Sequence, residues 1–164
     1  MRSTFIIMIP LLSACFYKKP EKTGLEGKPL PSFAIQLADS SKFFNMQNVP
    51  AGKSAVLLLF SPECTYCNLE MKQIVENIDK LKKIHFYLIT PFPHKDMKEF
   101  ADKYRLHSFN NITIGRDTSN FYGQYTGAIS IPFIAVYDKN KKMVRAFAGK
   151  TDVDVIKEVA ETNK

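Results

Sequence analysis

Cys64 and Cys67, two cysteines with two residues between them, are the side chains whose type and spacing best suit chemistry. They follow the apolar run 55–60, and an amphipathic helical pattern begins at the second cysteine. Residues three apart on a helix lie on one face with Cβ atoms about 5–6 Å apart, and a disulfide needs about 3.5–4.5 Å, so the pair can close with little distortion. Unpartnered N–H groups and the helix dipole favour a thiolate at Cys64, and the thiolate is the nucleophile of disulfide exchange. We therefore predict a reversible dithiol.

The order of the two cysteines predicts separate roles, with Cys64 as the exposed attacking thiolate and Cys67 as the buried thiol that resolves the mixed disulfide. A permanent structural disulfide is one alternative, but closing so short a loop stabilises a protein little. A zinc site is another, and it needs two further ligands, whereas His85, His94 and His107 form no spaced pair. We predict no metal, and no cofactor beyond the redox-active disulfide itself.

The chain has 164 residues, of which 45% are hydrophobic, and this composition is typical of a single soluble domain. A mature domain of about 150 residues can bury roughly 68–70% of its unfolded surface, so it needs no metal or disulfide to fold. The net charge is 23 − 16 = +7, and the lysines are scattered along the chain. We interpret them as solvated surface residues of a monomer, which favours attraction to an anionic membrane surface over nucleic-acid binding.

The N-terminus has the features of an export signal. A short, positively charged start precedes an apolar run over 5–12, which is far too short to span a bilayer. Ser13 and Ala14 followed by Cys15 resemble the lipobox of bacterial lipoproteins. The resemblance implies that residues 1–14 are a signal peptide and that acyl chains are attached to the sulfur and the new amino group of Cys15. The alternative is an ordinary signal peptide with Cys15 left free, whereas lipidation removes this third cysteine from redox chemistry.

The stretch that follows Cys15 is polar and basic, contains Pro20, Gly24 and Gly27, and has no apolar period. We expect residues 15–28 to form a flexible tether between the lipid and a single domain over 29–164. The protein is thus expected to be exported and lipid-anchored to a bacterial membrane, facing the periplasm or the cell exterior.

Apolar patterns predict an α/β protein with alternating strands and helices. Alternating or continuous apolar runs predict strands over 33–37, 54–60, 84–89, 111–114, 133–137 and 143–148, with residues 43–44 in a hairpin partner of the first. Helical spacing predicts helices after Cys67, over 97–104, over 117–125 up to Gly127, and after a capping box of Thr151 and Asp154. A continuously apolar central strand implies cover on both faces. We therefore predict a mixed central sheet with helices on both faces.

This order of elements, with the dithiol after the central strand, resembles the thioredoxin fold. Ile131-Pro132 opens a strand where thioredoxin-like proteins carry a cis-proline facing the disulfide. Gly149 ends the hairpin where they keep a glycine near the substrate groove. The resemblance implies that these three residues, together with Tyr66, line a groove for substrate beside the dithiol.

The chain also resembles one branch of that superfamily. The pattern Gly-Lys-x-Leu-Pro-x-Phe over 27–33, the pair Gly52-Lys53, and an extra helix and strand between 93 and 114 are similar to the TlpA/ResA-like proteins. The resemblance covers residues 27–162. It implies a redoxin lipoprotein, that is, a thioredoxin-like thiol–disulfide oxidoreductase. Its substrates would be protein disulfides, and a membrane electron-transfer protein would reduce it again.

The sequence departs from thioredoxin around the dithiol. Glu63 stands where thioredoxins usually have tryptophan, and Thr65-Tyr66 replaces Gly-Pro between the cysteines. Leu58 occupies the position of the buried aspartate that handles the proton of the second cysteine. Proton transfer must therefore use water, Glu63 or a group that the sequence does not place.

Two other functions remain open. Peroxiredoxins, which reduce peroxides, carry the pattern Pro-x-x-x-Thr-x-x-Cys; here Ser61 could replace the threonine, but Leu57 stands where proline is needed. The other alternative is a non-catalytic lipoprotein that uses a thioredoxin fold for binding, and the dithiol together with Ile131-Pro132 disfavours it. The sequence defines neither the substrate nor the direction of electron flow.

Overall fold

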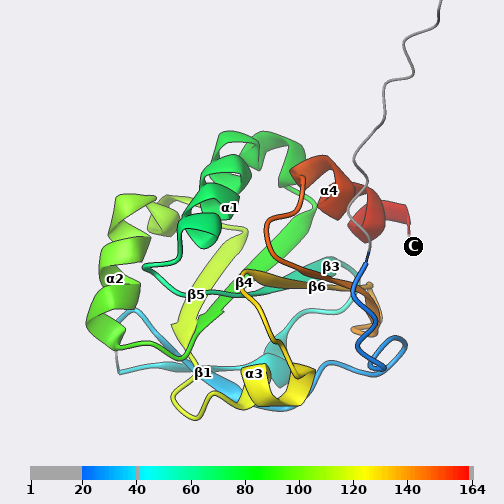
Figure 1. The fold of residues 1–164 in the computed structure, drawn as a ribbon, viewed down its shortest axis with the longest axis horizontal. Helices are drawn as coiled ribbons and strands as arrows, with labels where there is room; N and C mark the ends of the chain where they lie inside the picture. The colour runs from blue at the N-terminus through cyan, green and yellow to red at the C-terminus, as the bar shows by residue number, and fades with distance from the viewer. Residues whose placement is uncertain (1–19, 40, 163–164) are drawn as a thin grey trace, which may run out of the picture.

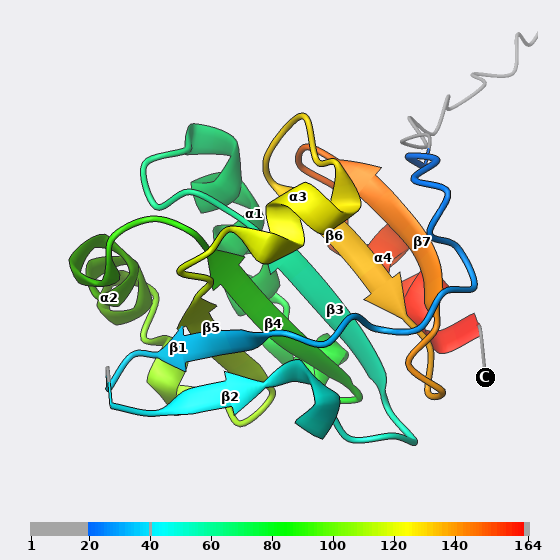
Figure 2. The ribbon, with the colours of Figure 1, turned by 90° about the horizontal axis from the view of Figure 1, so that it is seen from below.

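A mixed sheet forms the centre of the fold. The computed structural model describes residues 20–39 and 41–162, so the predicted signal peptide, Cys15 and the first residues of the tether lie outside the described residues. The described strands lie in the order β2-β1-β5-β4-β3-β6-β7 (Figure 1 and Figure 2). Their bounds are β1 Ala34–Leu37, β2 Phe43–Asn45, β3 Ser54–Leu59, β4 Ile84–Thr90, β5 Ile112–Arg116, β6 Phe133–Tyr137 and β7 Met143–Ala148.

The three central strands are parallel. β3 pairs in parallel with β4, and β4 with β5, whereas the remaining pairs are antiparallel. The predicted mixed sheet is therefore confirmed. Because parallel strands point the same way, the segments that follow β3, β4 and β5 all leave from the same end of the sheet, at the carboxyl ends of these strands. We call this end, which carries Cys64, the reactive end.

Helices cover both faces of the sheet, as predicted. Their bounds are α1 Thr65–Glu76, α2 His94–Lys103, α3 Phe121–Thr126 and α4 Val153–Thr162. Buried side chains of α1, α2 and α4 belong to one core cluster, and the α3 residue Tyr122 belongs to the cluster on the other face (Figure 1). No helix in the described part of the chain is long and apolar enough to cross a bilayer.

The alternation of residues 55–60, which form β3 after its first residue together with the residue that follows it, explains why this run is apolar throughout. Side chains of even number pack under α1, α2 and α4, and those of odd number pack on the α3 side; they are Val56, Leu58 and Phe60, then Ala55, Leu57 and Leu59. All six are buried. A strand with two buried faces has no solvent side, so it keeps apolar residues at every position.

Several helix starts differ from the predictions: α1 begins at Thr65 rather than after Cys67, and α2 begins at His94 rather than at residue 97. α3 begins at Phe121 rather than at residue 117, because the Asp117 carboxylate accepts a hydrogen bond from the Tyr122 N–H at 2.7 Å and caps the helix from outside. The predicted capping box of Thr151 and Asp154 is wrong. The Asp154 N–H donates to Asp152 Oδ1 at 2.8 Å, whereas the hydroxyl and the N–H of Thr151 bond elsewhere.

The N-terminal segment is also more ordered than expected. The N–H of Glu21 donates to the Ala146 carbonyl at 2.8 Å, and the N–H of Gly27 donates to the Met143 carbonyl at 2.7 Å. Residues 21–28 thus lie along β7 and are no free tether (Figure 2). The physical reason is that β7 is an edge strand, whose unpaired backbone groups are satisfied by any chain that runs beside it.

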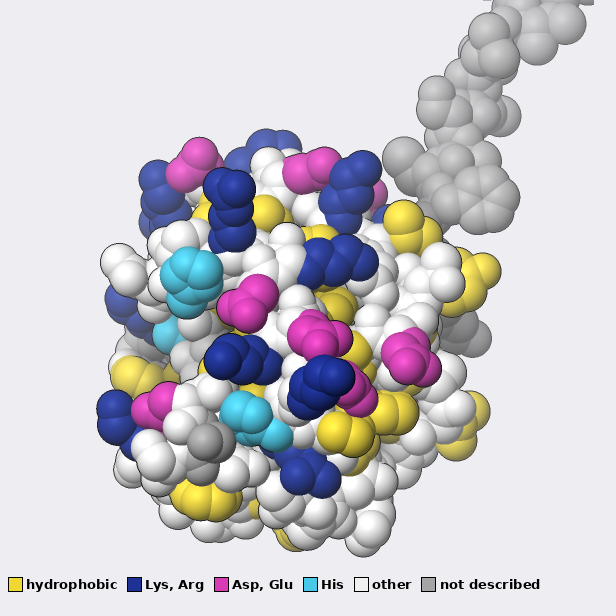
Figure 3. Space-filling view, turned by 90° about the vertical axis from the view of Figure 1, so that its left-hand side faces the viewer, with side chains coloured by type: hydrophobic (Ala, Val, Ile, Leu, Met, Phe, Trp, Pro, Cys, Tyr) yellow, Lys and Arg dark blue, Asp and Glu magenta, His cyan; other side chains and the backbone are white. Residues whose placement is uncertain are grey.

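Charged side chains of both signs are mixed on the surface in Figure 3, with lysine and arginine next to aspartate and glutamate. The ion pairs of the described residues join side chains three or four positions apart, such as Lys72 with Glu76 and Lys95 with Glu99, both at 3.8 Å. Exposed pairs of this kind contribute little to stability. The predictions that the protein is monomeric and binds no nucleic acid stay predictions.

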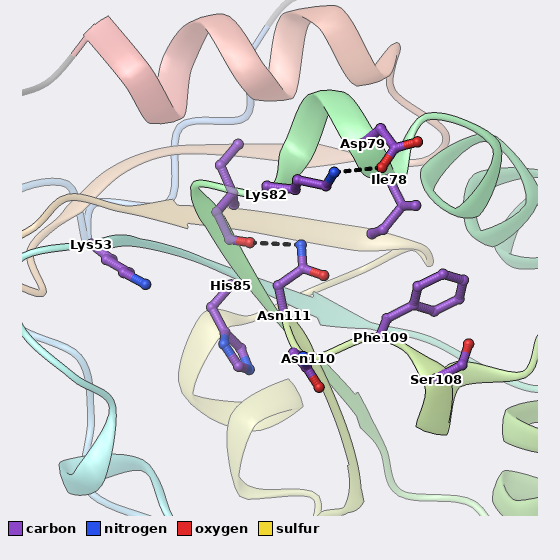
Figure 4. Close-up of a pocket in the computed structure, with 10 residues that line it drawn as sticks. Lys53, Ile78, Asp79, Lys82, His85, Ser108, Phe109, Asn110 and Asn111 are labelled. Atoms are coloured by element: carbon purple, nitrogen blue, oxygen red, sulfur yellow. Dashed lines mark hydrogen bonds and ion pairs between the residues drawn. The ribbon is translucent and has the colours of Figure 1, made fainter.

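A cavity of about 430 Å³ lies at the end of the sheet opposite to the reactive end, between Lys53, His85 and Asn111 (Figure 4). His85 Nε2 lies 2.9 Å from Thr113 Oγ1 on the neighbouring strand. Burial, and secondly the charge of Lys53, lower the pKa of His85. The site thus holds the imidazole in its neutral form at neutral pH.

We expect acid to destabilise the protein in part through His85. Its pKa in the folded state lies below the ordinary value of 6.5, so the unfolded state binds the proton more tightly. The stability from the neutral ring is present above about pH 6.5 and is lost as the pH falls below it. Urea unfolding of wild type and His85→Gln at pH 7.5 and 5 measures the effect, since glutamine can still bond Thr113 but does not titrate. An equal loss of stability in both proteins would contradict this expectation.

Candidate functional site

Cys64 caps the amino end of α1. Its Sγ accepts a hydrogen bond from the Cys67 N–H at 3.3 Å, and its backbone is extended, as an N-cap requires. The Asn68 side chain donates to the carbonyls of Cys64 and Pro62, both at 2.9 Å, and holds the turn before the helix. The sulfur is half-buried and points to the first turn of α1, where N–H groups and the helix dipole favour a negative charge. This position suits a nucleophile.

Cys67 lies one turn further into the protein and is only 1% exposed. Burial raises the pKa of the Cys67 thiol, and the hydrogen bond with Cys64 and the nearby Glu70 raise it further. Both cysteines are free thiols in the structure. A half-buried sulfur and a buried one, three residues apart, are the arrangement that a two-step disulfide exchange needs.

The Ile131–Pro132 peptide bond is cis. The Ile131 carbonyl oxygen lies 3.9 Å from Cys64 Sγ, so the backbone before Pro132 faces the dithiol as the resemblance implied. Gly149 has a φ of 77° and donates its N–H to the Pro132 carbonyl at 2.7 Å, which fixes the end of β7 beside the start of β6. The structure therefore brings Ile131, Pro132 and Gly149 to the reactive end.

Glu70 is a buried carboxylate that the sequence analysis did not identify. It is 0% exposed and lies one turn after Cys67 on the same face of α1, close enough to act on the pKa of that thiol. Its Oε2 accepts from the Thr151 N–H and its Oε1 from Gln73 Nε2, both at 2.8 Å. Leu58 is buried and apolar, so β3 carries no carboxylate at that position, whereas Glu70 is a buried carboxylate close to Cys67.

Exposed apolar side chains lie near Cys64. Tyr66, between the two cysteines, is 63% exposed. A cavity of about 460 Å³ opens beside the site, and its lining includes Leu59, Phe92, Gln124 and Ile131. Since Ile131 also faces Cys64, anything bound in this cavity lies next to the reactive sulfur.

The described residues contain no group of three or more His, Cys, Asp or Glu side chains placed to hold an ion. Glu63, the proton-transfer candidate named from the sequence, is exposed next to Cys64, whereas Glu70 is buried.

The raised pKa of Cys67 predicts a stability change in alkali. The folded state holds the thiol proton more tightly than the unfolded state, so its stabilising effect is complete below the ordinary thiol pKa and is lost as the pH rises. Between about pH 8.5 and 10 we expect the reduced protein to lose up to about 1.4 kcal/mol per pH unit relative to Cys67→Ala. Urea unfolding across this range measures the difference. Parallel curves for the two proteins would show that Cys67 titrates normally.

Residues 27–160 match the model of the AhpC/TSA family. The chain belongs to the AhpC/TSA family. A search of curated proteins found no match. Membership of the AhpC/TSA family confirms the predicted thioredoxin-like, redoxin classification.

Solved structures share the fold of this AhpC/TSA chain. The structure of MTB dsbF has a TM-score of 0.68 and 21% identity and covers 80% of this chain and 95% of its own. A secreted Mycobacterium tuberculosis disulfide oxidoreductase homologous to E. coli DsbE has a TM-score of 0.62 and 21% identity, with 78% and 94% covered. Enterococcus faecalis AhpC has a TM-score of 0.68 and 11% identity, with 84% and 92% covered. These likenesses confirm the thioredoxin-like fold.

Proposed function

We propose that the protein is an exported, lipid-anchored thiol–disulfide oxidoreductase of the TlpA/ResA-like kind, which reduces protein disulfides. The observation that carries this proposal is the division between an N-capping, half-exposed Cys64 and a buried Cys67, with the backbone of Ile131 at 3.9 Å from the first sulfur. The apolar surface around Cys64 supports a polypeptide substrate.

The reaction moves two electrons from the dithiol to a substrate disulfide. The Cys64 thiolate attacks one substrate sulfur, the substrate S–S bond breaks, and a mixed disulfide forms while the other substrate sulfur leaves as a thiolate. Cys67 then loses its proton and attacks the Cys64 sulfur, which releases the second substrate sulfur and leaves the Cys64–Cys67 disulfide. We assign the role of proton acceptor in the second step to Glu70, a buried carboxylate one turn after Cys67 on the same face of α1. The chemistry needs no dissociable cofactor, and a membrane electron-transfer protein would restore the dithiol.

A peroxide reductase is the second candidate, because the AhpC/TSA family match and the likeness to Enterococcus faecalis AhpC favour it. Against it, Leu57 lies in the middle of β3, paired with Tyr87 and Ala135, where the peroxidatic pattern requires proline. The open apolar surface at Cys64 also suits a polypeptide better than a small polar peroxide.

Two assays run side by side separate these functions. With dithiothreitol as electron source, we expect the protein to accelerate the reduction of insulin disulfides. We expect it to consume hydrogen peroxide no faster than the Cys64→Ala variant does. Peroxide consumption without insulin reduction would establish the second candidate instead. Inactivity in both assays would favour a binding protein.

The anchor is tested by Cys15→Ala in the full-length chain. Acylation of Cys15 would hold the domain on membranes, so the variant is expected to remain in the supernatant after sedimentation of membranes, or to accumulate unprocessed. Export is also supported by the secreted mycobacterial protein of the same fold. A processed variant that still sediments with membranes would contradict lipid attachment at Cys15.

A further inference from the structure

The described chain enters the domain beside the end of β7, which is paired with the strand that follows the cis-proline. Glu21 is paired with Ala146, two residues before the end of β7, and Ala148 at that end is paired with Phe133, which follows Pro132. Glu21 also lines a cavity of about 240 Å³ together with residues 126–129 of the loop that leads to the cis-proline. In Figure 2 the start of the described chain in blue, the loop after α3 and the end of β7 lie at the same end of the molecule.

The remaining tether is short. Six residue steps separate Cys15 from Glu21, and an extended chain spans at most about 3.3–3.6 Å per residue, which gives about 20–22 Å. A compact domain of this size has a radius of gyration of about 14 Å and is therefore some 35–40 Å across. A tether shorter than the domain restricts how the domain can turn on the membrane, and it joins the domain near the end of β7, whose partner strand follows Pro132.

Exposed apolar side chains gather at the same end. Six large hydrophobic residues of the described chain are more than a third exposed, and five of them lie in α1, in the loop after β4, in α3 or in the loop after α3: Tyr66, Leu69, Phe92, Phe121 and Ile129. Ile129, in the loop that shares a cavity with Glu21, is 91% exposed. Lys18 and Lys19 lie in the tether itself, and each lysine near an anionic bilayer contributes about 1 kcal/mol of attraction.

We propose that the reactive end of the domain faces the bilayer, so that Cys64 exchanges with disulfides of integral membrane proteins at the membrane surface rather than with freely diffusing proteins. The proposal rests on the lipid at Cys15 that is part of the proposed function. The exchange is the one already written, with two electrons passing from the dithiol to the disulfide of the membrane protein. A partner confined to the same surface benefits from a high effective concentration, which a short tether preserves.

The test measures how accessible the Cys64 thiol is to reagents when the protein is bound to a membrane. Full-length lipidated protein, reduced and bound to vesicles of phosphatidylethanolamine and phosphatidylglycerol, is labelled with N-ethylmaleimide or with a maleimide that carries a large polyethylene glycol chain. The ratio of the two labelling rates reports access for a bulky reagent.

Soluble Cys15→Ala gives the reference ratio. A Gly-Ser insertion of about 12 residues after Lys19 adds up to about 40 Å of reach and frees the domain to turn. Lys139→Cys in a Cys64→Ser background places a thiol at the opposite end as the matched control.

On vesicles we expect labelling of Cys64 by the bulky reagent to slow about tenfold relative to Cys15→Ala, since an orientation bias of that size corresponds to only about 1.4 kcal/mol. The insertion should restore the rate, and the thiol introduced by Lys139→Cys should be labelled equally fast on and off vesicles. Equal access to Cys64 in all proteins, protection that survives the insertion, or protein that is not lipidated would each overturn the proposal. Labelling does not depend on turnover, so a failure of the insulin assay would refute the proposed activity without changing this result.

Discussion

Cys64→Ala is expected to abolish disulfide reduction, with a loss of at least about a thousandfold, because it removes the thiol that attacks the substrate disulfide. Cys67→Ala is expected to keep the first chemical step and lose the second. Its Cys64 sulfur still caps α1 and lies 3.9 Å from the Ile131 carbonyl, so it can attack a substrate, but no second thiol releases the product. The measurement is non-reducing electrophoresis with mass spectrometry after mixing each variant with oxidised insulin.

Covalent adducts through Cys64 should accumulate in Cys67→Ala and be absent from Cys64→Ala. Lys72→Ala serves as a control in α1, since the Lys72 side chain is exposed and forms a surface pair with Glu76. It should reduce insulin at close to the wild-type rate. Adducts that form through Cys67 in Cys64→Ala would reverse the two roles.

Glu70→Gln is expected to slow the release of the mixed disulfide by about a hundredfold at neutral pH, the lower end of what general-base catalysis contributes. The amide cannot take the Cys67 proton. Removing the carboxylate also removes one of the causes that raise the Cys67 pKa, but burial is the largest cause and remains. The slow rate should increase steadily with pH without reaching a plateau below about pH 10, because burial keeps the Cys67 pKa well above the ordinary thiol value. Stopped-flow measurement of the second phase across pH tests this, and a wild-type rate at neutral pH would exclude Glu70 as the proton acceptor.

Glu70→Ala should in addition destabilise the protein by about 2–4 kcal/mol, since it leaves the Thr151 N–H without its buried partner and opens a cavity in the core. Glu76→Gln is the matched control in the same helix. Glu76 forms an exposed pair with Lys72 at 3.8 Å, and such a pair contributes little. Urea unfolding should therefore separate the two variants clearly.

The site and the fold were predictable where the signal was local or periodic. The spacing of Cys64 and Cys67, the apolar run that became β3 and the pattern of the hairpin over 133–148 each follow from side chains that are close in sequence. Pro132 came from the resemblance, since no local rule places it beside a dithiol in another element.

Glu70 was missed because a charged residue in a helix is normally solvated. The available signal was its spacing: it stands three residues after Cys67 and just before Met71 in the buried stripe of α1. Its burial depends on the N–H of Thr151, which is 81 residues away in the sequence and cannot be paired with it in advance. The same contact explains the wrong capping box, because Thr151 serves Glu70 and Gly149 instead of α4.

The pairing of residues 21–28 with β7 was hidden for another reason. Main-chain bonds to an edge strand need no side-chain pattern, and Gly24 and Gly27 resemble a flexible linker in sequence. In the structure both glycines have positive φ values, 74° and 80°, and shape turns that keep the segment on the domain.

The most direct test of the account is a redox titration of the Cys64–Cys67 pair. The Cys15→Ala protein, which lacks the third thiol, is equilibrated in glutathione buffers and quenched with acid, and its mass is measured by mass spectrometry. The account predicts a reversible loss of two hydrogens with a midpoint between about −270 and −120 mV, the range of known dithiol proteins. Thiols that stay reduced in every buffer, or a stable glutathione adduct on Cys64 that Cys67 does not displace, would contradict it.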